Sequence, residues 1–379
     1  MLPDDITQAV LARKDVARYL RGGHGQSEVE ARERIHAYLD ELRTTQRYPI
    51  YRALKHPLYP ILRKVDRIEE HVSIAQQAAQ GGRVIYVSNH KSHLDYLVEP
   101  LVIDDAGIRP PITAAGINLF GGPLGLLHRH VTGAIPIRRN TKDPAYLVTL
   151  KAYVGEVLRR HDLFFYLEGG RSYTGELKMP KTGLIHAALS AEIEQLAIIP
   201  VAIAYDLVLE DRILSRQGVK RSQRPFSREL AEMVGAAVGY RTRAFVSFGA
   251  PVSLDGLDPH SRREGLELSR TIRERIGLLH KVLPTALVAQ AMRPSATRRE
   301  METRVTGLLD VLASRGANLG AVDSARQAVE QGIEQLILRS VIVPESQRYR
   351  VRDRTLLRYY ARSIEHLLSA SRQSGARPH

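Results

Sequence analysis

Apolar residues near the start of the chain recur at helical spacing. Ser27 and Glu30 stand at the spacing of a capping box, which marks the start of a helix. The apolar positions that follow share one helical face: Ala31, Ile35, Tyr38 and Leu42. A second amphipathic segment covers residues 48–65. We therefore predict a helical N-terminal region over residues 1–78.

The pattern then changes, because short apolar runs that suit buried strands alternate with helical stretches. The predicted strands cover residues 83–89, 132–139, 163–170, 197–206 and 242–254. Helices are predicted from about Asp95, from the N-cap and N1 pair Asp143-Pro144, and over residues 182–195. This alternation predicts an α/β domain over residues 79–258, with a mixed, largely parallel sheet flanked by helices. From about His260 the pattern is helical and rich in arginine, so residues 259–379 are predicted to form a helical C-terminal region.

Composition and charge narrow the classes of partner. The 379 residues are 44% hydrophobic and 25% charged, which is typical of a globular protein. There is no cysteine, which excludes disulfides, thiolate metal sites and cysteine nucleophiles. The formal net charge of +14 favours anionic partners: nucleic acid, acidic lipid headgroups, phosphorylated substrates or an acidic carrier protein.

The longest uncharged span is Pro110–Leu127. It is just long enough to cross a bilayer as a helix, but Pro110, Pro111, Pro123 and several glycines argue against that helix. Two alternatives stay open: a bent segment that lies at a membrane interface, or a buried turn region. The N-terminus "MLPDDITQAV" carries acids where a signal peptide needs basic residues, so we expect no export signal.

Polar clusters follow three of the predicted strands: Asn89–Asp95, Arg138-Arg139 and Glu168–Ser172. In α/β sheets of this kind ligands bind beyond the carboxyl ends of the strands. The three clusters therefore predict one site that is built from segments distant in the sequence.

His90 and Asp95 are the candidates for acid-base chemistry. Five residues apart on a helix, they would face directions roughly 140° apart at about 3.6 residues per turn. They can meet if His90 lies in the loop and Asp95 in the first helical turn, where the carboxylate orients the ring and leaves one nitrogen as a base. Alternatively, Ser92 or Asp95 only caps the helix.

No protein nucleophile is evident, because the chain has neither cysteine nor a G-x-S-x-G motif. A histidine base would then activate a hydroxyl of the substrate, or water. No cluster of metal ligands is evident either, and we predict no metal site. The run Gly175–Thr182 superficially resembles a phosphate-binding loop, but Pro180 replaces its second glycine and no strand leads into it, so we reject nucleotide hydrolysis.

The other two clusters suit an anionic substrate. Arg138 and Arg139 can fork onto a phosphate or carboxylate, or form a solvated basic turn. Gly169 and Gly170 permit a sharp turn close to a ligand. The neighbouring side chains supply acceptors and donors for substrate hydroxyls and an anion: Glu168, Arg171 and Ser172.

Four segments together resemble a known family. "NHKSHLDY", "GAIPIRR", "FFYLEGGRSYTGELKMPKTG" and "IIPVAIAYD" resemble, in order and spacing, the four blocks of the glycerol-3-phosphate acyltransferase family, in its membrane-associated bacterial and mitochondrial branch. The segment "AAGINLFGGPLG" is also similar to that branch. The resemblance covers roughly residues 80–210. Two departures, Tyr173 where arginine is common and Pro136 where an aromatic or aliphatic residue is common, bear on the identity of the acceptor.

The resemblance implies roles for the candidate residues. His90 is the base and Asp95 orients it. The second block implies that Arg139, with Arg138, binds phosphate. The third block implies substrate binding by Glu168, Gly169, Arg171 and Ser172, and Pro200 marks the fourth block.

By the same resemblance, the protein transfers a fatty acyl group from acyl-CoA or acyl-carrier protein to the sn-1 hydroxyl of glycerol 3-phosphate. The product is lysophosphatidate, the reaction is the first step of phospholipid synthesis, and no cofactor is expected. The alternative acceptors are dihydroxyacetone phosphate and a lysophospholipid. A less favoured alternative is a non-catalytic basic protein that binds membrane or nucleic acid, although no nucleic-acid motif is present.

We expect a peripheral protein at the cytoplasmic face of the cell membrane, because the product partitions into lipid and the chain is basic. The predicted contact surfaces with anionic lipid are Pro110–Leu127 and the aromatic, basic segment Tyr48–Lys64. The same basic surface could dock an acidic acyl carrier.

Overall fold

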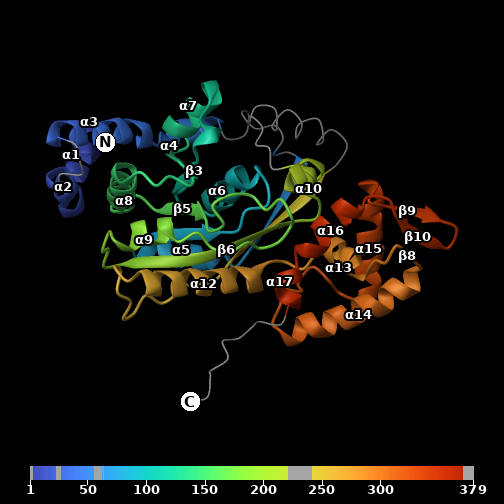
Figure 1. The fold of residues 1–379 in the computed structure, drawn as a ribbon. Coiled ribbons are helices and arrows are strands. Elements are labelled where there is room, and N and C mark those ends of the chain that lie inside the picture. Colours follow the sequence, from blue (N-terminus) through green and yellow to red (C-terminus); the bar gives the residue numbers. More distant parts are fainter. Residues whose placement is uncertain (1–2, 23–26, 55–61, 63, 221–240, 370–379) are drawn as a thin grey trace, which may run out of the picture.

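A seven-stranded sheet forms the centre of the computed structural model (Figure 1). The structure describes residues 3–22, 27–54, 62, 64–220 and 241–369. The strand order is β1-β7-β6-β2-β5-β3-β4. The strands are β1 (Val65–Glu70), β2 (Arg83–Ser88), β3 (Ile112–Gly116), β4 (Ala134–Ile137), β5 (Leu163–Tyr166), β6 (Leu196–Tyr205) and β7 (Thr242–Phe248).

All neighbouring strands in this sheet are parallel except β6 and β7, which are antiparallel. Side chains of the central strands alternate between two apolar layers, since successive residues of a strand face opposite sides. Val84 and Tyr86 of β2 pack in one cluster, and Ile85 and Val87 in the other. Strands buried on both faces have continuous apolar sequences, which is why they could be predicted. The predicted α/β class with a mixed, largely parallel sheet is confirmed.

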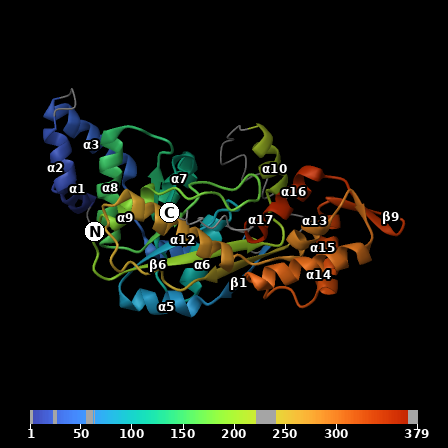
Figure 2. The same ribbon diagram turned by 60° about the horizontal axis from the view of Figure 1, so that its bottom comes forward.

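Helices cover both faces of the sheet (Figures 1 and 2). The layer with Ile85 contains α1 (Pro3–Leu11), α2 (Lys14–Arg21), α3 (Glu28–Leu42), α8 (Pro144–Leu158), α9 (Gly183–Leu189) and α12 (Arg262–Leu279). The layer with Tyr86 contains α4 (Tyr48–Leu54), α5 (Val72–Gly81), α6 (Asp95–Asp105) and α10 (Asp211–Lys220). It continues into α13 (Pro284–Ala291), α14 (Arg298–Ser314), α15 (Ala325–Leu338), α16 (Arg354–Arg362) and α17 (Glu365–Leu368).

Two predicted helix starts are confirmed by their capping contacts. Ser27 and Glu30 form the capping box at the start of α3. Asp143 caps α8 by accepting from the backbone N–H of Ala145 at 3.0 Å. The helix predicted over residues 182–195 is shorter, because α9 ends at Leu189 and Glu192 adopts a left-handed φ of 50°.

The prediction of a helical region over residues 1–78 is wrong for its last part, which contains β1 and most of α5. β1 is an edge strand that pairs with β7 alone, so its outer positions carry charge and the sequence "VDRIEE" lacks an apolar run. Of the predicted amphipathic segment 48–65, α4 covers residues 48–54, while residues 55–61 and 63 lie outside the described part of the chain.

The prediction that residues 259–379 are helical is incomplete. They include a small antiparallel sheet with the strand order β8-β10-β9. Its strands are β8 (Ser295–Ala296), β9 (Ile342–Glu345) and β10 (Arg348–Val351). They are two to four residues long, too short to show a strand period.

Residues 110–127 divide into two parts. Residues 110–116 are buried and contain β3, so the interface-seeking alternative is wrong for this half of the segment. A 3₁₀ turn, η2 (Ile117–Leu119), and α7 (Gly122–His130) follow, and Ile117 and Leu126 expose 41% and 62% of their surface. Among the described residues, no helix combines the length and the apolar character needed to span a membrane.

Candidate active site

The loop between β2 and α6 holds His90 and Asp95. His90 lies in the loop and Asp95 is the first residue of α6, the arrangement that the spacing required. The His90 Nδ1 atom lies 2.8 Å from Asp95 Oδ2, and both residues are buried. The predicted meeting of the two side chains is confirmed.

Asp95 is held by donors on both oxygens. Oδ2 also accepts from the backbone N–H groups of Lys91 and Ser92, at 2.6 and 2.9 Å. Oδ1 accepts from the hydroxyl of Tyr205, at the end of β6, at 2.7 Å. Asp95 therefore closes the loop at the start of the helix and orients His90 at once, so the two alternatives from the sequence are compatible.

These contacts fix the state of the imidazole. Since the ionised carboxylate is an acceptor, Nδ1 of His90 carries the hydrogen and Nε2 keeps a free lone pair. Burial lowers the pKa of His90 well below its ordinary value, and the charges of Arg171, Arg139 and Lys178 lower it further. The ring of Tyr166 stacks on the imidazole with centroids 3.9 Å apart and planes 9° apart. His90 is thus a neutral, rigidly held base.

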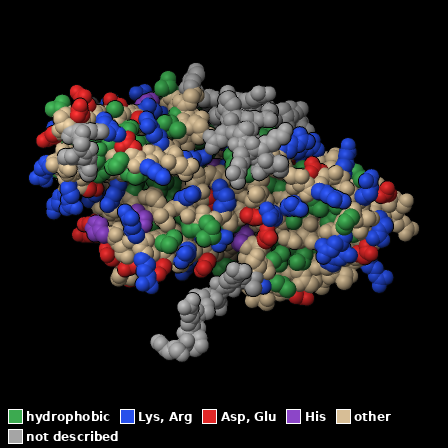
Figure 3. All heavy atoms as spheres, viewed as in Figure 1, with side chains coloured by type: hydrophobic (Ala, Val, Ile, Leu, Met, Phe, Trp, Pro, Cys, Tyr) green, Lys and Arg blue, Asp and Glu red, His purple; other side chains and the backbone are tan. Residues whose placement is uncertain are grey.

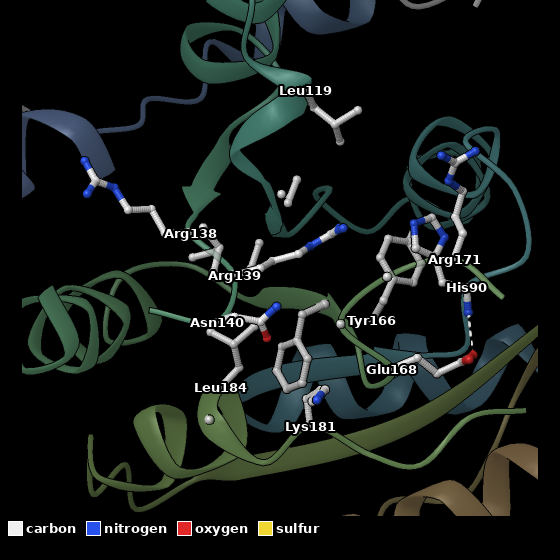
Figure 4. A pocket seen from close by; sticks show the side chains of 18 of the residues that line it. His90, Leu119, Arg138, Arg139, Asn140, Tyr166, Glu168, Arg171, Lys181 and Leu184 are labelled. Carbon is white, nitrogen blue, oxygen red and sulfur yellow. Dashed lines mark hydrogen bonds between the residues drawn. The ribbon is translucent and has the colours of Figure 1, made fainter. Parts of the chain in front are cut away.

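His90 opens into a cavity of about 580 Å³ that the three predicted clusters share. Asn89–Asp95 follows β2, Arg139 follows β4 and Glu168 follows β5, so the carboxyl ends of three parallel strands contribute (Figure 4). The prediction of one site from distant segments is confirmed in its geometry.

The two arginines of the second block point in different directions in Figure 4. Arg139 points toward His90, and it forms no hydrogen bond or ion pair within the part of the chain that the structure describes. Arg138 points away, and its Nε donates to Glu41 of α3 at 2.7 Å, with the guanidinium over the rings of Tyr38 and Tyr146. The structure brings only Arg139 toward the base.

Glu168 ties two loops of the site together. Its carboxylate accepts from the backbone N–H of His90 at 3.0 Å and from that of Lys178 at 3.1 Å (Figure 4 shows the first bond). Gly169 adopts a φ of 66°, in the left-handed region that favours glycine, and lines the cavity. Glu168 therefore positions the backbone of His90, and each oxygen keeps a second lone pair for a ligand.

Arg171 and Ser172 have different surroundings. Arg171 lines the cavity, with its Nη1 atom 3.8 Å from Glu210. Ser172 is fully buried, and its backbone N–H donates to the carbonyl of His90 at 2.9 Å while its hydroxyl donates to the carbonyl of Glu176. Ser172 does not line the cavity, so its predicted substrate contact lacks geometric support.

Several further residues belong to the site, and the sequence analysis did not include Glu210 among its candidates. Lys178 and Lys181 line the cavity beside Arg139, and Lys178 also donates to the carbonyls of Gly170 and Arg171. Glu210 accepts from the Ser92 hydroxyl and from the backbone N–H of His93. The signal for Tyr205 was present, because it closes the fourth block, but only tertiary packing shows that its hydroxyl meets Asp95.

Part of the cavity lining is apolar. It includes Leu97, Ala114, Ala115 and Leu119, with Tyr96 and His128 in edge-to-face contact at 4.9 Å. The cavity can therefore accommodate a molecule with an anionic end and an apolar chain. No group of three or more metal-ligating side chains occurs among the described residues.

Comparisons with known proteins agree with this geometry. Residues 69–204 match the family model described as "Acyltransferase". The chain is 30% identical over 320 residues to a glycerol-3-phosphate acyltransferase of Aeromonas hydrophila, covering 76% of this chain and 39% of that protein. It is 32% identical over 295 residues to a glycerol-3-phosphate acyltransferase of Pseudomonas syringae, covering 70% of this chain and 35% of that protein. The chain thus spans little more than a third of the length of these relatives.

Among solved structures, a 1-acyl-sn-glycerophosphate acyltransferase from Thermotoga maritima aligns over 72% of this chain and 94% of its own, at 14% identity and a TM-score of 0.34. The family match and the relatives confirm the resemblance that the four blocks indicated. The chain contains an acyltransferase domain over residues 69–204 and is related to the glycerol-3-phosphate acyltransferases.

Proposed function

We propose that this protein transfers a fatty acyl group from a thioester donor to the sn-1 hydroxyl of glycerol 3-phosphate, which gives lysophosphatidate. The observation that carries the proposal is the juxtaposition of a neutral, carboxylate-bound His90 with the unpartnered guanidinium of Arg139 at one cavity. The relatives from Aeromonas hydrophila and Pseudomonas syringae, both glycerol-3-phosphate acyltransferases, support the same acceptor.

The reaction follows from the contacts of His90. Nε2 takes the proton of the acceptor hydroxyl while that oxygen attacks the thioester carbonyl carbon. The tetrahedral intermediate collapses, the C–S bond breaks, and the imidazolium returns the proton to the departing thiolate. Asp95 stabilises the imidazolium, and a base of this kind contributes ~10²–10⁴-fold to the rate. Since a thiolate leaves readily, no covalent enzyme intermediate is required.

The cations of the cavity are the candidates for binding the phosphate of glycerol 3-phosphate. Arg139 and Lys181 have no partner among the described residues, and Lys178 and Arg171 lie beside them. When the phosphate of glycerol 3-phosphate binds there, the hydroxyl groups of the same molecule lie near His90. Binding therefore orients the acceptor for attack on the thioester. Arg138 is a weaker candidate for this role than its neighbour, because Glu41 already holds its guanidinium.

The test is thiol release from palmitoyl-CoA with glycerol 3-phosphate, combined with identification of the lipid product. Wild-type release should require the acceptor, yield lysophosphatidate, and fall at least ~100-fold in His90→Ala. His36→Ala, at an exposed position of α3, is the control and should keep the wild-type rate. Dihydroxyacetone phosphate and a lysophospholipid are assayed in parallel, and much faster use of either would replace the proposed acceptor.

We also propose that the protein works as a peripheral protein on anionic lipid at the cytoplasmic face of the membrane. The net charge of +14 and the exposed apolar residues Ile117 and Leu126 support this. Each Lys or Arg near such a surface adds ~1 kcal/mol. Leu126→Asp should reduce co-sedimentation with anionic vesicles, and unchanged binding would remove this segment from the contact.

A further inference from the structure

A second hollow lies next to the His90 cavity. It has a volume of about 540 Å³ and forms where α9 lies between α8 and α12 (Figures 1 and 2). Thr182, the N-cap of α9, lines both hollows, so they adjoin there. The lining of the second hollow is Lys151, Thr182, His186, Ser190, Pro259, His260, Arg262 and Leu266.

The two hollows follow one groove. On α8, Leu147 and Leu150 line the first hollow and Lys151 lines the second, and residues at these spacings share one helical face. On α9, Thr182 and His186 are one helical turn apart. On α8 the lining therefore changes from apolar in the first hollow to cationic in the second, within one helical turn.

Two cations, Lys151 and Arg262, line the second hollow. Lys151 and Arg262 form no hydrogen bond or ion pair within the described part of the chain. Arg262 is the first residue of α12, whose N-terminus adds partial positive charge. Burial lowers the pKa of His186, and the charges of Arg262 and Lys151 lower it further. In Figure 3, Lys, Arg and His side chains, with acids among them, gather over this part of the face.

Three acids lie close by, and each has a partner. Asp258 accepts from the backbone N–H of His260 at 2.8 Å. Glu192 lies 3.2 Å from His260 Nε2 at the exposed rim. Glu264 accepts from the backbone N–H of Asp258 at 2.7 Å. Lys151 and Arg262 therefore remain available to an anion that enters the hollow.

We propose that this second hollow, here called the nucleotide cavity, binds the phosphorylated nucleotide end of an acyl-CoA donor. The uncharged pantetheine arm then lies along Thr182 and Leu150 and delivers the thioester to His90. This inference rests on the proposed acyl transfer and identifies CoA, rather than a carrier protein, as the donor. A concave site of this volume falls within the about 300–1,000 Å³ typical of small-molecule pockets, whereas a carrier protein docks on a broad surface.

The experiment compares two donors in Arg262→Glu and Lys151→Glu. Palmitoyl-CoA carries the phosphates, and palmitoyl-pantetheine lacks them. We expect KM for palmitoyl-CoA to rise about tenfold in each variant, the loss of one charge-assisted contact, with kcat unchanged. The KM for palmitoyl-pantetheine should stay at the wild-type value. Binding of 3′,5′-ADP, measured by calorimetry, should weaken in parallel.

Arg263→Glu is the matched control. It changes the charge by the same amount at the adjacent residue of α12, but Arg263 pairs with Glu267 and does not line the nucleotide cavity. This control should leave both KM values and 3′,5′-ADP binding unchanged.

Three results would overturn the inference: an unchanged KM for palmitoyl-CoA in both variants, an equal loss with palmitoyl-pantetheine, or transfer from acyl-carrier protein alone. Failure of the proposed function is a separate result, namely no glycerol-phosphate-dependent transfer from any donor by the wild type. The calorimetry with 3′,5′-ADP needs no turnover, so it judges the nucleotide cavity in that case as well.

Discussion

The loop at residues 89–95 and the cationic lining of the two hollows differ in how their polar groups are satisfied. In the loop, both oxygens of Asp95 and the ring of His90 have partners within the chain, and Glu168 and Glu210 hold the backbone around them. In the lining, Arg139, Lys181, Lys151 and Arg262 have none among the described residues.

The difference separates two tasks. A base must be held rigidly before substrate arrives, so its hydrogen bonds are made within the folded chain. A cation that binds a phosphate must keep its donors free, so its charge is left uncompensated until the ligand enters. Arg138 and Arg139 show the distinction at adjacent positions, since Arg138 is paired with Glu41 whereas Arg139 points toward His90.

The largest effect is expected when His90 loses the carboxylate of Asp95 that orients it. Asp95→Asn cannot stabilise the imidazolium and disturbs the tautomer of His90, so kcat should fall about 10²–10⁴-fold. Steady-state kinetics with palmitoyl-CoA and glycerol 3-phosphate measures this, and an unchanged thermal transition verifies folding. A rate within a fewfold of wild type would mean that Asp95 serves only the loop.

The next largest effect is expected from a comparison of substitutions at Arg139 and Arg138. Arg139→Ala should raise KM for glycerol 3-phosphate about 10–100-fold, because a charged contact to the phosphate is lost. Arg138→Ala should change that KM less than about threefold, since it loses a half-exposed ion pair worth little. Initial rates at varied concentrations of glycerol 3-phosphate give KM for the two variants. A larger increase in KM for Arg138→Ala than for Arg139→Ala would contradict the assignment of Arg139 as the phosphate-binding residue.

A smaller effect is expected at the hydroxyl that holds Asp95. Tyr205→Phe removes one hydrogen bond to the carboxylate, so kcat should fall about 3–10-fold. Without that donor the carboxylate attracts the imidazolium proton more strongly, so the acid limb of the pH profile should move to higher pH.

Tyr86→Phe is the control for Tyr205→Phe. Tyr86 lies in the same sheet, and its buried hydroxyl has no partner within the described chain. Its removal should leave the pH profile unchanged. A general weakening of the core would affect both variants, whereas positioning of Asp95 affects only Tyr205→Phe.

The smallest effect tests whether every unpartnered polar group marks a ligand site. His280 is buried with no hydrogen bond on either ring nitrogen among the described residues, and burial lowers its pKa well below the ordinary value. Below about pH 6.5, His280 binds a proton in the unfolded chain but not in the folded one. The free energy of unfolding therefore falls as the pH falls. His280→Leu should reduce the loss of unfolding free energy between pH 7.5 and 5 by about 1 kcal/mol.

Urea unfolding at the two pH values measures this change. His36→Leu, at an exposed position, should retain the full pH dependence. An equal loss in the wild type and in His280→Leu would mean that His280 takes up its proton in the folded state as easily as in the unfolded chain.

Much of the fold could be predicted because its signals are local. The central strands are continuous apolar runs, and the caps at Ser27 and Asp143 depend on residues two or three positions away. The edge strand β1 and the small sheet of β8, β9 and β10 could not be predicted in this way. Such short or edge strands have no long apolar run and are defined by the strands they pair with. The strand β3 was missed because its short apolar run lies inside a longer uncharged segment.

The sequence by itself determined the chemical types in the site and the meeting of His90 with Asp95, because only four residues separate the two and the strand-to-helix turn brings them together. It could not distinguish Arg138 from Arg139, place Ser172 away from the cavity, bring Tyr205 to Asp95, or bring Lys181 to the lining of the cavity. Those outcomes depend on contacts between segments more than 80 residues apart, such as Arg138 with Glu41 and Tyr205 with Asp95. The direction of a side chain is set by the partner it meets, and only tertiary packing decides which partner that is.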